Sequence, residues 1–250
     1  MKNDLLKDNF STLATSYAMF RPVYPRELYD YIMHFVNEKQ LAWDCGTGNG
    51  QAAAALSKYF TQVYASDISS KQIENARREI NVIYAVEAAG NTSLPADSVD
   101  LVTVSQALHW FAGDEFYREV KRVTKSSAVI AAWTYGLLEI DSLTDEIIQD
   151  YHYQTLGTYW DDARKYVNNG YIDIPFPFAP IPSPPFNIRV NWNLQQLEGY
   201  LNTWSALQQF IQVNKFSPLK VLVKRIEKNW PRGEVRPVNF PLTLRLGNVH

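Results

Sequence analysis

The fold is decided by Leu41-Ala42-Trp43-Asp44-Cys45-Gly46-Thr47-Gly48-Asn49-Gly50, which an alanine-rich stretch over residues 51–58 follows. The mostly apolar run 41–45 predicts a buried strand, and the alternating glycines predict a turn from which a helix begins. Backbone N–H groups at such a helix start attract an anionic group, and glycine lets a ligand approach the backbone closely. We therefore expect a strand, turn and helix that hold a ligand at the turn.

The same alternation of strands and helices continues along the chain. Strands are predicted at 62–65, 82–86, 100–105, 128–133, 186–191 and 242–246, and helices at 4–14, 26–37, 69–79, 113–124, 141–155, 160–167, 194–214 and 218–228. Strands that alternate with helices indicate a mostly parallel sheet. Six of the 13 prolines lie between Pro175 and Pro185, which predicts an extended surface connection without ladder pairing.

Composition excludes several classes of protein. With 250 residues, 46% of them hydrophobic and 20% charged, the chain is long and apolar enough to fold around a sizeable core. The net charge of -2 gives no general attraction for nucleic acid. One cysteine and four scattered histidines predict neither a disulfide framework nor a metal site. Without a signal sequence or an apolar run of about 20 residues, we expect a soluble, cytoplasmic protein with no membrane contact.

Asp67 is the second residue that indicates chemistry. It follows the strand predicted at 62–65, and a carboxylate at the carboxyl edge of the sheet can accept hydrogen bonds from both hydroxyls of a ribose. Its alternative role is to cap the next helix, which Ser69 performs equally well. An NAD site is disfavoured, because its fingerprint requires glycine three positions after the second glycine and residue 51 is Gln.

A third stretch carries the resemblance to a family. The run from Leu94-Pro95 through the strand at 100–105 to Gln106-Ala107-Leu108-His109-Trp110-Phe111 completes the pattern of the glycine turn and Asp67. Together these stretches resemble the class I S-adenosylmethionine-dependent methyltransferases, and the chain is most similar to their trans-aconitate methyltransferase-like branch of small-molecule enzymes. Residues 17–25 and 199–206 support this branch. Residues 137–185 match no segment of the family.

The resemblance implies an architecture. We expect one α/β domain over residues 1–250, with a seven-stranded, mostly parallel Rossmann-like sheet, helices on both faces and an antiparallel last strand. Residues 1–38 would form an N-terminal helical lid and 39–136 the cofactor-binding core. Residues 137–185 would form a cap insertion that sets the choice of acceptor, and 186–250 would complete the sheet.

The resemblance also implies S-adenosylmethionine as the cofactor. Gly46 and Gly48 would border its methionyl part, Asp44 would lie near its ammonium group, Asp67 would hold the ribose and Ile68 would pack against the adenine. The full set of expected cofactor residues is Tyr17, Arg21, Asp44, Gly46, Gly48, Gly50, Asp67, Ile68, Ala89 and Gln106.

One departure from the family concerns the adenine. The family commonly places an acidic residue before the alanine equivalent to Ala89, where it accepts a hydrogen bond from the adenine amino group. Here Ala88 occupies that position and Glu87 is one residue away. Adenine recognition would then rest on backbone and stacking contacts.

The acceptor side of the site offers two chemical alternatives. An ionised carboxylate needs no general base, and Arg21, Tyr17, Tyr135 or His109 would donate hydrogen bonds to it. A hydroxyl or carbon acid would need a base, for which His109 is the natural candidate unless it is structural. The expected catalytic residues are His109, Tyr135 and Arg21. The expected acceptor pocket comprises His109, Trp110, Trp133, Tyr135 and Trp204. Trp133 and Trp204 could instead be core side chains, whereas Trp110 and Tyr135 follow strand ends on the edge where ligands bind, which favours the pocket.

We therefore expect an enzyme that methylates a small organic molecule, most simply the carboxylate of an organic acid. The first alternative, a methyltransferase acting on a macromolecule, is disfavoured because Ser105-Gln106-Ala107-Leu108 stands where nucleobase enzymes carry Asn/Asp-Pro-Pro and an aromatic residue. The second, a binding module without catalysis, is supported by Ala88 alone. The sequence predicts no oligomeric state.

Overall fold

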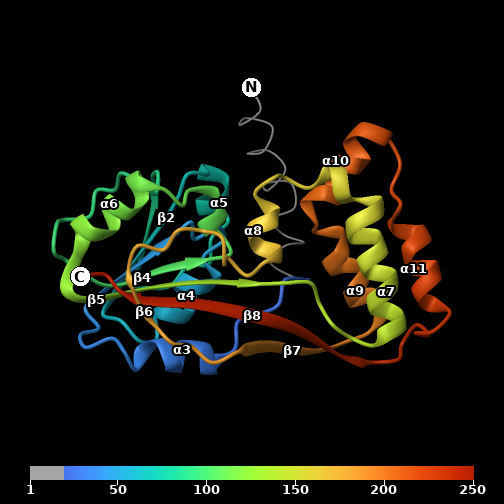
Figure 1. Ribbon diagram of the computed structural model, residues 1–250, viewed down its shortest axis with the longest axis horizontal. Coiled ribbons are helices and arrows are strands. Elements are labelled where there is room, and N and C mark those ends of the chain that lie inside the picture. The colour runs from blue at the N-terminus through green and yellow to red at the C-terminus, as the bar shows by residue number, and fades with distance from the viewer. Residues whose placement is uncertain (1–19) are drawn as a thin grey trace. The chain divides into compact units, whose positions relative to one another are not determined.

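An eight-stranded sheet organises the described residues, which run from 20 to 250 in the computed structural model (Figure 1). The predicted helix at 4–14 and Tyr17 lie outside these residues. The strand order is β3-β2-β1-β4-β5-β8-β6, and β7 also pairs with β8. The strands are β1 (Leu41–Cys45), β2 (Gln62–Asp67), β3 (Val82–Val86), β4 (Val99–Ser105), β5 (Thr124–Tyr135), β6 (Ala179–Ile181), β7 (Phe186–Trp192) and β8 (Arg236–Asn248).

Strands β3, β2, β1, β4 and β5 are parallel, whereas β8 runs antiparallel to β5. This confirms the predicted mostly parallel, Rossmann-like α/β sheet with an antiparallel last strand. β1 lies between β2 and β4, with Asp44 in register with Ala65 on one side and Thr103 on the other. The carboxyl ends of β1, β2 and β4 therefore meet at one edge of the sheet.

Helices cover both faces of this sheet. One face of the sheet carries the side chains of Trp43, Val102 and Ile130, because these residues are in register across β1, β4 and β5. On this face Trp43 packs against Phe116 of the helix α6. Side chains alternate between the two faces along a strand, so Trp133, three positions after Ile130, points to the opposite face. There it packs against Tyr29 of α3. The helices are α3 (Arg26–Met33), α4 (Gln51–Leu56), α5 (Ser70–Glu74), α6 (Asp114–Val123), α7 (Ser142–Asp150), α8 (Arg164–Asn168), α9 (Leu194–Asn202), α10 (Ser205–Asn214) and α11 (Leu219–Glu227).

The chain separates into two compact units. Unit 1 comprises residues up to 22, 137–164 and 187–241, and unit 2 comprises 23–136, 165–186 and 242–250. Unit 2 contains the parallel strands and the glycine turn. The segment 137–185, expected to form one cap, is divided, because residues 137–164 belong to unit 1 and residues 165–185 to unit 2.

Several predicted elements were wrong in extent, and three of them show why. The helix expected over 69–79 ends at Glu74, because the N–H of Arg77 donates instead to the carbonyl of Asn49 in the glycine turn (3.0 Å). The helix expected over 194–214 is two helices, since Trp204 is extended (ψ 126°). The last strand begins at Arg236 rather than Leu242, although it contains two prolines.

The proline-rich segment was also predicted incorrectly. Residues Ala179–Ile181 form β6 and pair with β8, so the sheet has eight strands within residues 20–250 rather than the expected seven. Pro180 is tolerated because β6 is an edge strand, in which a residue without an N–H need not interrupt the ladder.

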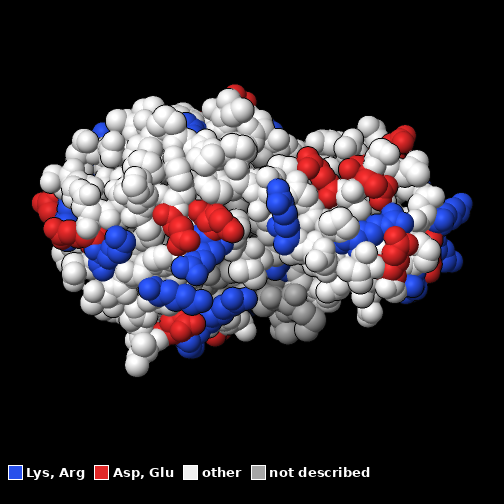
Figure 2. Space-filling model, turned by 90° about the horizontal axis from the view of Figure 1, so that it is seen from below, with Lys and Arg blue, Asp and Glu red and all other residues white. Residues whose placement is uncertain are grey.

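Surface charges of both signs are interspersed on the face shown in Figure 2. Ion pairs such as Lys125 with Asp100 (2.7 Å) and Lys125 with Glu38 (2.8 Å) join neighbouring side chains of opposite sign. This view shows no extended patch of positive charge. In residues 20–250, no helix has the length and apolar character required to cross a bilayer.

Candidate functional site

The glycine turn follows β1 with three left-handed glycines. Gly46, Gly48 and Gly50 have φ values of +67°, +56° and +75°, a region that other residues adopt at a cost. A Cβ on Gly46 would come within 2.7 Å of Ala107, and one on Gly50 within 2.3 Å of the Tyr84 hydroxyl. A Cβ on Gly48 would meet no atom within 4 Å. The first and last glycines therefore permit close packing, while the middle one borders open space.

Asp44 lies at the end of β1 and is completely buried (0% exposed). The hydroxyl of Thr47 donates to its Oδ2 (2.5 Å), and that of Thr103 donates to its Oδ1 (2.7 Å). Burial raises the pKa of Asp44 to about 6, although these two hydrogen bonds favour the ionised form. A cationic group beside it would stabilise the charge further.

Asp67 ends β2 and is held against the glycine turn. The backbone N–H of Gly48 donates to its Oδ2, and the N–H of Ser69 donates to its Oδ1, both at 2.9 Å. Burial raises the pKa of Asp67, and these backbone hydrogen bonds oppose the shift. Ser69 caps α5 by accepting from the N–H of Gln72 (3.4 Å), so capping does not require Asp67. A carboxylate has about four acceptor positions, which leaves Asp67 capacity for a ligand hydroxyl.

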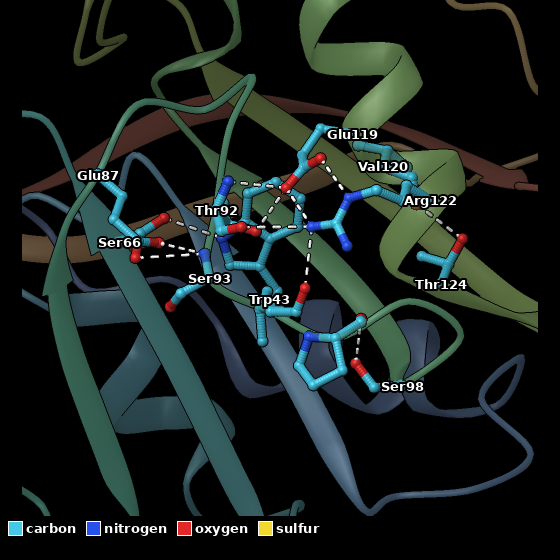
Figure 3. A network of polar contacts seen from close by, with 12 residues as sticks. Trp43, Ser66, Glu87, Thr92, Ser93, Ser98, Glu119, Val120, Arg122 and Thr124 are labelled. Carbon is cyan, nitrogen blue, oxygen red and sulfur yellow. Dashed lines mark hydrogen bonds and ion pairs between the residues drawn. The ribbon is translucent and has the colours of Figure 1, made fainter.

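Next to Asp67, the side chain of Ile68 is 62% exposed, although it is large and apolar. The loop that carries Ala89 starts nearby, because the N–H of Glu87 donates to the carbonyl of Asp67 (3.0 Å). Glu87, the acidic residue closest to the position where the family commonly carries one, has its carboxylate engaged by other residues of the protein. The carboxylate of Glu87 accepts a hydrogen bond from the hydroxyl of Tyr64 (2.8 Å). It also accepts from the N–H of Ser93 (3.3 Å), as Figure 3 shows.

A polar network holds the other end of this loop to α6 (Figure 3). Both the N–H (2.7 Å) and the hydroxyl (2.6 Å) of Thr92 donate to Glu119, which also pairs with Arg122 (2.7 Å). The hydrogen bond from Arg122 is the main cause that lowers the pKa of Glu119 to about 2. Arg122 also donates to the carbonyl of Leu94 (2.9 Å), so the loop is fixed at both ends.

A hollow of about 410 Å³ adjoins this loop. It is lined by Ala88, Gly90, Asn91, Glu115, Arg118, Glu119 and Arg122, and no residue of the glycine turn lines it.

Gln106 follows β4 in a left-handed conformation (φ +55°), which is uncommon for a residue other than glycine. Its Oε1 accepts from the hydroxyl of Thr134 (2.5 Å), and its Nε2 donates to the carbonyl of Tyr135 (3.4 Å). Its backbone N–H donates to the carbonyl of Trp133 (2.9 Å). Strained backbone held by surrounding contacts is typical of functional sites.

His109 and Trp110 follow in a short 3-10 helix, Leu108–Trp110. The Nδ1 of His109 is hydrogen-bonded to the hydroxyl of Tyr171 (3.0 Å), which comes from the segment that matched no part of the family. Tyr171 is buried and left-handed (φ +67°), and its carbonyl accepts from Arg245 (2.6 Å). Trp110 is 45% exposed, as expected for a side chain that can contact a ligand.

The remaining expected residues have different surroundings. Trp133 is buried against Tyr24 and Tyr29, although its indole N–H has no hydrogen-bond partner among the described residues. Tyr135 is also buried in unit 2. Trp204 is buried in unit 1 among other aromatic rings, which favours its core alternative.

Arg21, like Trp204, belongs to unit 1. Its guanidinium lies over the ring of Tyr200 (5.2 Å) and donates to the carbonyl of Thr203 (3.5 Å). The structure therefore brings the expected residues from 44 to 135 to unit 2, and places Arg21 and Trp204 in the other unit.

Sequence reasoning missed four side chains that orient the site, namely Thr47, Thr103, Thr134 and Tyr171. The three threonines contact Asp44 and Gln106 through their hydroxyls. Thr103 and Thr134 were detectable as polar residues within the mostly apolar runs 101–104 and 128–135. Tyr171 had no signal, because it is 62 residues from His109 in the chain.

The edge residues of unit 2 fit the cofactor that the resemblance implies. Open space at Gly48 admits a ligand against the backbone, and the exposed Ile68 offers an apolar surface for a base. The carboxylate of Asp67 has spare acceptor positions for ribose hydroxyls, and that of Asp44 carries a charge opposite to an ammonium group.

Comparisons with known proteins agree with this fit. The model of the methyltransferase domain family matches residues 43–132. A Dictyostelium discoideum protein provisionally named a methyltransferase is 36% identical over 247 residues, covering 96% of this chain and 94% of that protein. The Saccharomyces cerevisiae protein CRG1, provisionally named an S-adenosylmethionine-dependent methyltransferase, is 29% identical over 182 residues, 69% of this chain and 61% of that protein.

A solved structure is similar over nearly the whole chain. It is that of a provisionally named type II methyltransferase from Anaeromyxobacter dehalogenans, which has 36% identity and a TM-score of 0.86 and covers 92% of this chain and 98% of that one. Sequence, fold and site geometry thus agree on the cofactor and on the reaction type. This chain belongs to the class I S-adenosylmethionine-dependent methyltransferases.

Proposed function

We propose that this methyltransferase forms the methyl ester of a small organic acid. S-adenosylmethionine supplies an electrophilic methyl group on a positively charged sulfur, and an acceptor oxygen takes that methyl group as the carbon–sulfur bond breaks. A carboxylate is already ionised at neutral pH, so no proton has to be removed. The protein then has to bind the acceptor, align it and exclude water.

The hydrogen bond between His109 and Tyr171 carries this proposal. The Nδ1 of His109 is hydrogen-bonded to the hydroxyl of Tyr171 (3.0 Å), which fixes the imidazole ring after the end of β4. An imidazole held at Nδ1 can donate a hydrogen bond from its other ring nitrogen to a carboxylate. His109 would then orient the acceptor, and ester formation would require no base.

The cofactor side is assigned to the edge of unit 2. Asp44 would pair with the ammonium group, Asp67 would accept from the ribose, and Gly46 and Gly48 would border the methionyl part. Ile68 would pack against the adenine, and the loop at Ala89 would contact its edge. Gln106 would lie beside the methyl group as a neutral amide, held in place by Thr134.

Acceptor residues are proposed on the same edge. His109, Tyr135 and Trp110 follow the ends of β4 and β5, where ligands of open α/β sheets bind. Trp133 remains a proposed acceptor residue of unit 2. The roles expected of Arg21 and Trp204, which belong to unit 1, and of Tyr17, which lies outside the described residues, stay predictions from the sequence. The small size of the acceptor is supported by the resemblance to trans-aconitate methyltransferase-like enzymes. A cytoplasmic location and the absence of nucleic-acid partners stay predictions.

A methylation assay with chemical identification of the product tests this proposal. The full chain is incubated with S-adenosylmethionine and a panel of small carboxylic acids, each paired with its amide and its alcohol. We expect a product from an acid but not from its partners, and alkaline hydrolysis should return the acid and methanol, as for an ester. A product that resists alkali, or methylation confined to protein or nucleic acid, would contradict the proposal. Binding of S-adenosylhomocysteine with no product from any compound would favour a binding module.

A further inference from the structure

Unit 1 contains a group of packed aromatic rings, which we call the unit 1 aromatic cluster: Tyr151, His152, Trp160, Tyr200 and Trp204. The ring of His152 lies 4.7 Å from that of Trp160 and 5.5 Å from that of Trp204. Tyr151 stacks on Trp204 at 6.2 Å, and Tyr200 meets Trp204 edge-on at 6.1 Å. Trp204 is thus in contact with rings on several sides.

Two polar side chains in this cluster lack partners. Tyr151 is 2% exposed and His152 is 1% exposed. In the part of the chain that the structure describes, neither the hydroxyl of Tyr151 nor either ring nitrogen of His152 makes a hydrogen bond. Native proteins satisfy nearly all buried polar atoms, so three such atoms on adjacent residues require an explanation.

The same two residues begin an unusual helical turn. Residues Tyr151–Thr155 form a π-helix at the end of α7. Single π turns are rare and frequently mark functional sites. Tyr153 of this turn is 54% exposed, so the turn has an outer surface in solvent and an inner surface that carries the two unpartnered side chains. Local opening of the turn would give a ligand access to them.

The electrostatics of the cluster favour an anion. The guanidinium of Arg164 lies over the ring of Trp160 at 4.6 Å. Burial, and then the charge of Arg164, lower the pKa of His152 to about 4, so the ring is neutral at pH 7. A neutral imidazole has one N–H donor, and the Tyr151 hydroxyl supplies a second donor. Two donors and a nearby positive charge suit a carboxylate, and flat indole rings suit a planar body.

We propose that the unit 1 aromatic cluster is a binding site for a planar aromatic carboxylate. Its carboxylate would accept hydrogen bonds from the hydroxyl of Tyr151 and from the N–H of His152, and its flat body would pack against Trp160 and Trp204. The site lies within unit 1 and goes beyond the proposed ester formation, because it requires binding but not methylation of the ligand.

The test uses the full chain with trans-cinnamate as the probe and its uncharged amide as the control ligand. Binding is measured by calorimetry for the natural sequence and for Tyr151→Phe, His152→Phe and Tyr153→Phe. We expect cinnamate to bind at least tenfold more tightly than the amide. Tyr151→Phe and His152→Phe should each weaken binding at least tenfold, and Tyr153→Phe, whose hydroxyl is on the exposed neighbour, should leave it unchanged.

Thermal unfolding separates binding from packing. Tyr151→Phe removes one unpartnered oxygen, so its unfolding temperature should equal or exceed that of the natural sequence. A stable Tyr151→Phe variant that binds cinnamate normally would overturn the proposal, as would a natural sequence that does not bind cinnamate. Incubation with S-adenosylmethionine then distinguishes the ligand's role. Formation of the methyl ester would identify cinnamate as a methyl acceptor. Binding without methylation would identify it as a ligand that the enzyme does not consume. Both results uphold the site.

Discussion

Two sets of polar side chains in this protein differ in how they are held. At the sheet edge of unit 2, Asp44 and Asp67 each accept two hydrogen bonds. In the unit 1 aromatic cluster, Tyr151 and His152 have none among the described residues. The comparison teaches that the cofactor edge is organised by the protein itself, whereas the cluster leaves hydrogen bonds for a ligand to complete. Substitutions at the edge should therefore affect both stability and binding, and those in the cluster mainly binding.

The largest expected effect comes from the glycine turn. Gly46→Ala would place a methyl group 2.7 Å from Ala107 at a left-handed position and should lower the free energy of unfolding by about 2 to 4 kcal/mol. Gly48→Ala is the matched control, because its methyl group meets no atom within 4 Å. It should cost about 1 kcal/mol in stability but weaken cofactor binding. Denaturant unfolding and calorimetry measure both, and equal stability losses would contradict the assigned packing.

Asp67→Ala should weaken binding of S-adenosylhomocysteine by about 1 to 3 kcal/mol, since it removes a charged acceptor. Part of this loss of affinity comes from the two hydrogen bonds that Asp67 accepts from the N–H groups of Gly48 and Ser69. Ser69→Ala serves as a control because it removes the helix cap, at about 1 kcal/mol of stability, and keeps the carboxylate. Calorimetric titration of both variants compares them, and unchanged affinity in Asp67→Ala would remove Asp67 from the site.

Asp44 should make cofactor binding dependent on pH. Its pKa is raised to about 6, so it gains a proton below pH 6 and can no longer pair with an ammonium group. Affinity for S-adenosylhomocysteine should fall by about tenfold, or 1.4 kcal/mol, per pH unit below 6. The stability contribution has the opposite sign, because a raised carboxyl pKa stabilises the fold at low pH and this stabilisation is lost as the pH rises from about 4 to 6. Asp44→Asn should remove the loss of affinity that begins near pH 6, and what remains should be the contribution of Asp67, whose pKa burial also raises. An Asp44→Asn variant with the same pH profile as the natural sequence would refute the assignment.

His109→Ala should have the smallest effect. If the acceptor is a carboxylate, turnover should fall less than about tenfold, whereas loss of a general base would lower it by about 100-fold or more. Steady-state kinetics with the acid found in the panel decide between these outcomes. Tyr171→Phe provides a comparison, because it removes only the hydroxyl that contacts His109. A drop of 100-fold in His109→Ala would show that His109 is the base.

Most of the parallel sheet was predictable because its signals are local. The run of apolar residues in β1 and the glycines after it show the strand, turn and helix within about 15 residues. Asp67 and Gln106 were predicted as site residues because they follow predicted strands. The structure puts both at strand ends, and their roles toward the cofactor stay predictions. Two prolines led to wrong predictions. Pro180 lies in the edge strand β6, which was not predicted, and Pro241 precedes the part of β8 that pairs with β5, so the predicted strand began too late.

The partners of the site residues were less predictable, because they depend on contacts between distant parts of the chain. Thr103 reaches Asp44 across 59 positions, and Tyr171 reaches His109 across 62. The lack of hydrogen bonds to His152 among the described residues could not be predicted either. A sequence shows a histidine but not which atoms surround its ring.

Thermal unfolding with added ligands tests the central claim that the sheet edge of unit 2 holds S-adenosylmethionine. The full chain is compared with S-adenosylhomocysteine, S-adenosylmethionine and NAD at matched concentrations. A ligand at 100 times its dissociation constant stabilises by about 2.7 kcal/mol, which corresponds to roughly 5 to 10 °C for a chain of this size. We predict an upward shift with the first two ligands and none with NAD. A shift with NAD alone, or with none of the three, would contradict the account.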